Sequence, residues 1–225
     1  MHVILIGCEY TGKTTLAEGI STWLEENMGL AQFGRYSWHD HFVRPFAEGP
    51  EEDVQAEAQE VLAMSPGLLE KYSRYMIEYH TGDFFYLDNH LLLVDWYYAD
   101  AVYAPLYYGY GGREEYADRQ VMARSYDAKV MRKAPDTVLV LLKASADAVR
   151  ARMSEGPHRW NVLQDGDVEL VLQRFDEEYT RSGIRRRFTL DTTESTAEET
   201  LAEFLRQMEP HLTESDRLAL LYHSR

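Results

Sequence analysis

With 225 residues, of which 45% are apolar and 27% charged, the chain is long enough for one α/β domain with a filled core. Its formal charge of -15 argues against a general binder of long nucleic acids, whose phosphates would be repelled, but allows a small anionic ligand. No apolar stretch reaches the roughly 18 residues that span a bilayer, no secretory signal is evident, and the single Cys8 excludes an internal disulfide, so we expect a cytoplasmic protein.

Apolar runs that fit strands alternate along the chain with segments of helical period. Continuous runs such as HVILI predict strands that are buried on both faces of a parallel sheet. The expected strands are residues 2–6, 30–37, 90–95, 136–144 and 186–193. The expected helices are residues 13–29, 47–66, 67–82, 96–112, 113–134, 145–153, 168–182 and 196–212, with a further short helix in 213–225. This order predicts a single domain over residues 1–225, a three-layer α/β fold with a central parallel sheet of about five strands.

The segment GCEYTGKTT satisfies the phosphate-loop (P-loop) pattern G-x-x-x-x-G-K-T between the first expected strand and helix. Its glycines let the backbone curl so that N–H groups point at phosphate oxygens, and the helix N-terminus adds partial positive charge. We expect Lys13 to act in catalysis on the outer phosphates, and the Thr14 hydroxyl to ligate Mg²⁺. The predicted ATP-binding residues are Gly7, Glu9, Tyr10, Thr11, Gly12, Lys13, Thr14 and Thr15. The pattern predicts a P-loop NTPase fold that uses ATP and Mg²⁺.

Asp95 ends the clearest of the expected central strands, HLLLVD. The carboxyl end of such a strand lies beside the P-loop, so this acid is well placed to hold Mg²⁺ directly or through water. The alternative is that Asp95 only caps the following helix. We favour the metal role.

The order of elements and the P-loop make this chain resemble the nucleoside and nucleotide kinases, in particular the thymidylate kinase and deoxynucleoside kinase branch. The likeness in element order runs from residue 2 to about residue 209, but only the P-loop is a specific motif. The resemblance implies an enzyme that transfers the γ-phosphate of Mg-ATP to a small acceptor. The acceptor that it favours is a nucleoside or a nucleoside monophosphate.

An arginine-bearing lid follows the fourth strand in that family. Here residues 154–166 contain glycines and a proline and show no clear period, which predicts a mobile loop. By resemblance, Arg150, Arg152 and also Arg159 are candidates to close on the transferring phosphoryl group. Closure would exclude water and prevent idle hydrolysis.

The residues expected to bind the acceptor match the family less specifically than the P-loop does. Asp40 and Arg44 match the family's residues after the second strand, whereas Trp96 stands where the family has an arginine, which leaves the acceptor's identity open. If the acceptor is an alcohol, Asp40 is the candidate base; a phosphate acceptor needs none, and Asp40 is then an ordinary turn residue. Tyr97 and Tyr98 are candidates to stack on a base, although aromatic residues beside a sheet usually belong to the core.

Two other functions remain open. A P-loop ATPase or switch coupled to a protein partner is one, but the Asn-Lys-x-Asp string of GTPases does not occur here. The other is a kinase that acts on the hydroxyl of a compound other than a nucleoside. We expect a small-molecule partner, no membrane and no extended nucleic acid, with a homodimer as one option for the assembly.

Overall fold

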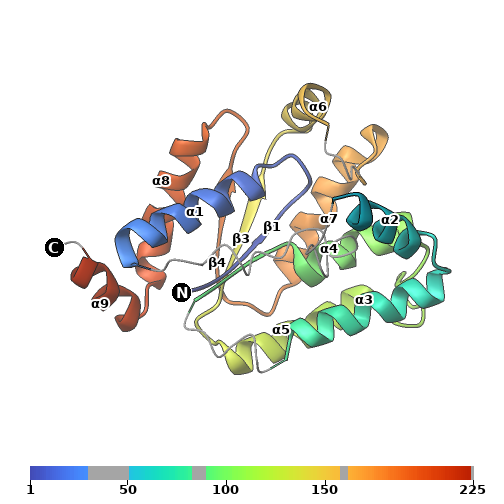
Figure 1. Ribbon diagram of the computed structural model, residues 1–225, viewed down its shortest axis with the longest axis horizontal. Helices are drawn as coiled ribbons and strands as arrows, with labels where there is room; N and C mark the ends of the chain where they lie inside the picture. Colours follow the sequence, from blue (N-terminus) through green and yellow to red (C-terminus); the bar gives the residue numbers. More distant parts are fainter. Residues whose placement is uncertain (30–50, 83–89, 158–161, 224–225) are drawn as a thin grey trace.

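The computed structural model describes residues 1–29, 51–82, 90–157 and 162–223 of the chain (Figure 1). The strands in these ranges are β1 (His2–Ile6), β2 (Leu91–Val94), β3 (Val138–Lys143) and β4 (Arg186–Asp191). The α-helices are α1 (Lys13–Met28), α2 (Glu51–Leu62), α3 (Pro66–His80), α4 (Trp96–Tyr103), α5 (Arg119–Lys133), α6 (Ala146–Glu155), α7 (Val168–Arg181), α8 (Ala197–Met208) and α9 (Glu214–His223). A π-helical turn, Ala104–Tyr108, continues α4.

The four strands form one parallel sheet in the order β2-β1-β3-β4. The order of elements expected from the sequence agrees with this sheet. The predicted strand over residues 30–37 lies outside the described residues, which accounts for four strands here against about five expected. Because all strands run the same way, the segments that follow β1, β2 and β3 meet at one edge of the sheet.

Alternate residues of β1 enter two different hydrophobic cores, as expected for a strand covered on both faces. Val3 and Leu5 pack in the core beneath α1 and α8. Ile4 and Ile6 pack in the other core, which α4, α5 and α7 cover. Figure 1 shows the resulting three layers, with α9 against the end of α1 and α3 alongside α5.

Helix α5 begins six residues later than its sequence pattern suggested. The Asp118 carboxylate caps it by accepting hydrogen bonds from the backbone N–H groups of Gln120 and Val121. Glu114 and Ala117 before it have positive φ angles of 62° and 60°, which a right-handed helix does not allow. The predicted helix over residues 113–134 is therefore wrong in its first turn and a half.

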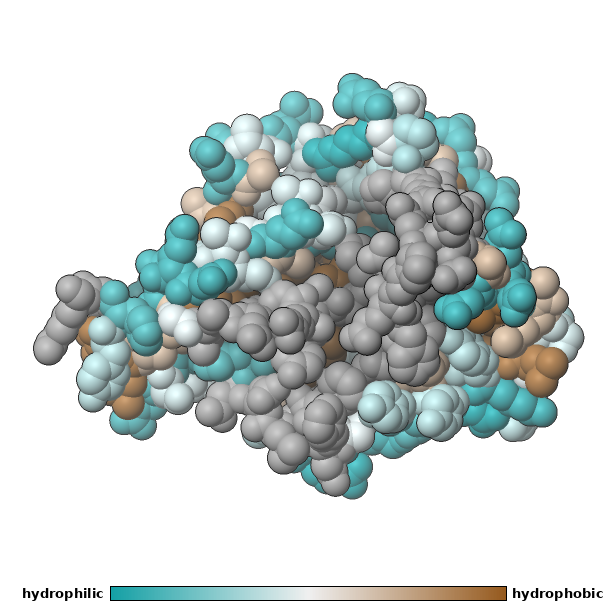
Figure 2. Space-filling view, in the orientation of Figure 1, coloured by the Kyte–Doolittle hydropathy of each residue, from teal (hydrophilic) through white to brown (hydrophobic). Residues whose placement is uncertain are grey.

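Most of the surface in Figure 2 is hydrophilic, in keeping with the charge of -15. Hydrophobic side chains reach the surface on α9, through Leu218 and Leu221, and where α2 leads into α3, through Leu62 and Leu68. In the described parts of the chain, no helix combines the length and the apolar character that crossing a membrane requires.

Candidate active site

The P-loop runs from the end of β1 to the start of α1, and two of its positions require glycine. Gly7 has a φ of 154°, and a Cβ atom there would lie 2.6 Å from the carbonyl oxygen of Leu142. Gly12 has a φ of 86° and is the N-cap of α1. The first turn of α1 thus points its N–H groups at the loop, the geometry that binds phosphates.

Lys13, the first residue of α1, is buried and folds back over the loop. Its Nζ atom donates hydrogen bonds to the carbonyl oxygens of Gly7 (2.6 Å) and Cys8 (2.7 Å). The same ammonium lies 3.3 Å from Oδ2 of Asp95. The structure therefore brings together the lysine of the P-loop and the acid that follows β2, as the sequence predicted.

Asp95 extends the ladder of the sheet, since its N–H donates to the Leu5 carbonyl (2.7 Å). Its side chain does not cap α4, so the structure disfavours the alternative role of a helix cap. Burial raises the pKa of Asp95 to about 6, while the Lys13 ammonium and the Gly7 amide oppose that rise. Asp95 and Trp96 have φ angles of 63° and 50°, two successive residues in a region that bulky side chains rarely adopt. Such strain gathers at functional sites.

The residues beside the P-loop fit a magnesium ion. Oδ1 of Asp95 is buried and accepts no hydrogen bond of ordinary geometry from the described residues. Thr14, the second residue of α1, follows Lys13 and is exposed. Within the described residues no cluster of three His, Cys, Asp or Glu could hold a metal, but Mg²⁺ commonly needs only one or two carboxylates, with phosphates and waters.

Glu9, predicted from the sequence only as a backbone contact to phosphate, has a structural role for its side chain. Its Oε2 atom accepts the N–H of Leu163 (3.1 Å), which lies between α6 and α7. Its own N–H donates to the Tyr103 hydroxyl (3.3 Å). Burial raises the pKa of Glu9, and hydrogen bonding to Leu163 and the charge of Lys13 oppose the rise. The P-loop is therefore tied to Leu163, a residue within the predicted lid segment.

The two predicted lid arginines lie in different surroundings. Arg150 is bound to carboxylates, with Nη1 2.8 Å and Nη2 2.6 Å from the two oxygens of Glu169, and Nε 3.3 Å from Asp165. Arg152 donates to the backbone carbonyls of Tyr10 (3.1 Å), Thr192 and Thr193 (3.3 Å). For either guanidinium to reach a phosphoryl group, it would have to leave these partners.

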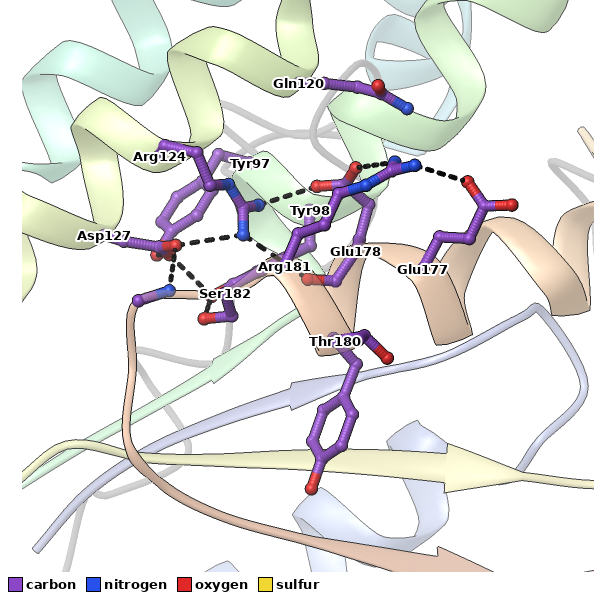
Figure 3. Close-up of polar contacts among 12 residues, drawn as sticks. Tyr97, Tyr98, Gln120, Arg124, Asp127, Glu177, Glu178, Thr180, Arg181 and Ser182 are labelled. Carbon is purple, nitrogen blue, oxygen red and sulfur yellow. Dashed lines mark hydrogen bonds and ion pairs between the residues drawn. The ribbon is translucent and has the colours of Figure 1, made fainter.

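Tyr97 and Tyr98, the candidates to stack on a base, lie in the core of this structure. Both rings are buried and stack on each other with centroids 4.5 Å apart. Their hydroxyls donate to one carboxylate oxygen of Asp127, at 2.7 and 2.6 Å (Figure 3). The other oxygen accepts the N–H of Gly183 (2.8 Å). A contact with substrate would require both tyrosines to give up these buried hydrogen bonds.

Asp40, Arg44 and Arg159 fall outside the described residues, so their roles stay predictions. Trp96, where the family has arginine, is fully buried, and its Nε1 atom has no hydrogen-bond partner in the described part of the chain. Thr192 and Asp127 are two further residues near the site that the sequence did not predict. Each bonds residues far away in the sequence, and no local pattern marks such contacts.

No family model and no curated protein sequence matches this chain, but several solved structures resemble it. The deoxyadenosine kinase of M. mycoides with bound dCTP has a TM-score of 0.58 at 15% identity, over 93% of this chain and 100% of that chain. The YorR protein from Bacillus subtilis, in complex with phosphorylated GDP, has a TM-score of 0.54 at 16% identity, over 95% and 100%. The chain therefore shares the fold of these two proteins. The prediction of a three-layer P-loop α/β fold is thereby confirmed.

Proposed function

We propose that this protein is a kinase that transfers the γ-phosphate of Mg-ATP to a small acceptor, with a nucleoside or nucleoside monophosphate favoured. The observation that carries the proposal is the P-loop with Lys13 at its centre and Asp95 against it, 3.3 Å away. The P-loop kinase fold supports it, since the deoxyadenosine kinase that shares the fold binds dCTP and dATP. At 13 to 16% sequence identity, the substrates of those proteins do not identify the acceptor of this one.

Each residue has a proposed task. Lys13 neutralises charge on the outer phosphates as it spreads over the transferring group. The N–H groups from Gly12 to Thr15 bind other phosphate oxygens, whereas those of Glu9 and Thr11 would first have to leave Tyr103 and Cys8. Thr14 and Asp95 would hold Mg²⁺, which would supply positive charge against the phosphates. The burial of Asp95 means that metal and Lys13 act in a site of low dielectric, where each charge counts for more than in water.

On the acceptor side, Asp40 and Arg44 remain the proposed residues. Asp40 would take the proton of an acceptor hydroxyl, and Arg44 would orient an anionic acceptor. We also propose a lid at about residues 154–166, with Arg150 as a contact to the transferring phosphoryl group.

The test is an acceptor screen that measures ADP formed from Mg-ATP across nucleosides, nucleoside monophosphates and non-nucleoside alcohols. We expect slow ATP turnover alone and a sharp rise with one class of acceptor, and the phosphorylated product should be isolated to prove transfer. Fast turnover that no small acceptor changes would contradict a kinase and favour a partner-coupled ATPase. A non-nucleoside alcohol as the best acceptor would contradict the favoured substrate class alone.

We also propose that the protein is a homodimer. Three large side chains on α3, Leu68, Tyr75 and Tyr79, are more than half exposed and share one face at helical spacing. Beside them on the neighbouring segment, Tyr116 is 77% exposed and receives the Arg74 guanidinium over its ring, 5.7 Å from the centroid. Tyrosine and arginine are the residue types enriched in the cores of protein interfaces.

A further inference from the structure

Arg152 on α6 makes an unusual set of contacts for a charged residue beside a nucleotide loop. Its two terminal nitrogens donate to the carbonyl oxygens of Tyr10, Thr192 and Thr193, and Nη1 also donates to the Thr192 hydroxyl (3.3 Å). Among the described residues, no carboxylate forms an ion pair with it. Within the described residues its charge is therefore stabilised by neutral oxygens, whereas that of Arg150 is stabilised by carboxylates.

Thr192 completes the arrangement from the segment after β4. This residue is buried, and its N–H donates to the Lys143 carbonyl at the end of β3 (2.8 Å). Its single hydroxyl hydrogen is donated to the carbonyl of Thr11 (3.0 Å) or of Lys143 (3.1 Å). Arg152 and Thr192 thus hold the carbonyls of two successive P-loop residues, Tyr10 and Thr11, from outside the loop.

The loop needs such support because Tyr10 has a φ of 64°. Residues other than glycine avoid this left-handed region, and they stay in it only where the surroundings fix the backbone. The Tyr10 carbonyl is fixed by the Arg152 guanidinium, and the next carbonyl by the Thr192 hydroxyl. The direction of the intervening N–H groups follows from the same peptide planes.

Arg152 also affects the charge around the loop. The Lys13 ammonium is paired with the Asp95 carboxylate, so these two residues together add little net charge. Arg152 contributes one positive charge that no carboxylate of the described residues offsets. A cation held at a fixed position beside the loop attracts a polyphosphate without touching it.

We propose that Arg152 and Thr192 form a clamp that presets the P-loop for the phosphates of a nucleotide, and that Arg152 is a positioning residue. It does not contact the phosphoryl group in transfer. The proposal rests on the proposed function only in taking a nucleoside triphosphate as the ligand of the loop.

The experiment measures the Kd for Mg-ATP by calorimetry, and kcat and KM with the best acceptor, for R152A, R152K, T192V and T192S. We expect R152A to raise the Kd about tenfold or more, since hydrogen bonds from a charged donor are lost, with kcat at saturating ATP changed less than about threefold. R152K should recover part of the affinity because it keeps the charge. T192V should weaken ATP binding without any change of charge, whereas T192S should restore it.

Thermal unfolding of each variant shows whether it folds, and Arg206→Ala on the exposed surface of α8 is the matched control. A loss of kcat of about a hundredfold with unchanged ATP affinity in R152A would overturn the proposal, because that pattern marks a contact made in the transition state. Unchanged affinity in both R152A and T192V would overturn it as well. If the wild type binds ATP but phosphorylates no acceptor, the kinase proposal fails while the Kd series still decides the clamp.

Discussion

The ion pair between Lys13 and Asp95 joins the proposed catalytic lysine to a residue with a strained backbone. Both side chains are at least 90% buried, and Asp95 occupies a backbone conformation that costs about 1 to 3 kcal/mol. Burial disfavours the ionised form of Asp95 and raises its pKa, and the charge of Lys13 opposes that rise. Replacing a buried ion pair with apolar side chains is often neutral or stabilising, so stability alone does not explain this pair.

Replacing Lys13 with methionine should leave the fold intact and reduce phosphoryl transfer by about a hundred- to a thousandfold. The fold survives because a buried Asp95 without its cation takes up a proton and becomes neutral. Turnover and the circular dichroism melting curve test both statements. Lys143→Met, at an exposed ion pair with Asp176, is the control, and it should change neither. A Lys13 variant with more than about a tenth of wild-type turnover would contradict the assignment of the P-loop.

Asp95→Asn should raise the Mg²⁺ concentration needed for half-maximal turnover by about tenfold or more. An amide carries no charge and binds a hard cation more weakly than a carboxylate does. The measurement is a magnesium titration of turnover at saturating ATP, with direct ATP binding in excess metal as the second readout. An unchanged magnesium requirement would show that Asp95 is not a ligand.

At the scale of the elements, the start of α4 is held by a polar network that joins α5 and α7 (Figure 3). Arg124 donates to Oε2 of Glu178 (2.7 Å) and lies 3.2 Å from Oδ2 of Asp127. The other oxygen of Asp127, Oδ1, accepts the two tyrosine hydroxyls. Glu178 is 1% exposed, and its Oε1 atom has no hydrogen bond within the described residues, with Arg181 at 3.7 Å. The helix that follows Asp95 is thus positioned by groups more than 25 residues away.

Glu178 should make the stability of the fold depend on pH. Burial raises the pKa of this carboxyl, although Arg124 and Arg181 oppose the shift. A raised pKa in the folded state contributes stability that is full below the ordinary carboxyl pKa and is lost as pH rises through the folded value. The free energy of unfolding of Glu178→Gln, relative to wild type, should therefore increase from about pH 4.5 toward neutral pH.

Urea unfolding of both proteins at several pH values measures this difference. Glu177→Gln is the control, because Glu177 is an exposed neighbour on the same helix that also pairs with Arg181. Parallel pH profiles for wild type and Glu178→Gln would contradict the prediction.

Features built from residues close together in the sequence were predictable, whereas most features built from residues far apart in the sequence were not. The P-loop is local, so the spacing of Gly7, Gly12 and Lys13 was enough to place it. The position of Asp95 beside it followed from the rule that parallel strands end at one edge. The clamp was not predictable, since Arg152 lies 142 residues from Tyr10. The burial of Tyr97 agrees with the general rule that aromatic residues beside a sheet belong to the core, but the sequence did not show which tyrosines would be exceptions.

At the scale of the whole molecule, the charge of -15 and the exposed tyrosines of α3 have opposite effects on association. Like charge keeps copies apart, and its reach falls as salt screens it. The apolar face of α3 favours contact, and a stable interface needs about 800 Å² from each partner. Association should therefore strengthen with ionic strength.

Light scattering after size exclusion should show a dimer at micromolar concentration, more fully populated at higher salt. Tyr75→Glu and Tyr79→Glu should each shift the population to monomers, because they place an acid in an apolar contact. The control is Tyr222→Glu on α9, which is equally exposed but lies on another face. A wild-type monomer at all salt concentrations would contradict the assembly.

Cys8 gives the protein an internal reporter. It is the one cysteine in the sequence, it is fully buried within the P-loop, and burial raises the pKa of its thiol to about 12. Because only an accessible thiolate reacts, a thiol reagent should modify the native protein solely through transient opening of the loop. The rate of labelling, followed by mass spectrometry, would then measure that opening without any added probe. Mg-ATP should slow it in proportion to occupancy of the site, and a rate indifferent to saturating nucleotide would show that the ligand binds elsewhere.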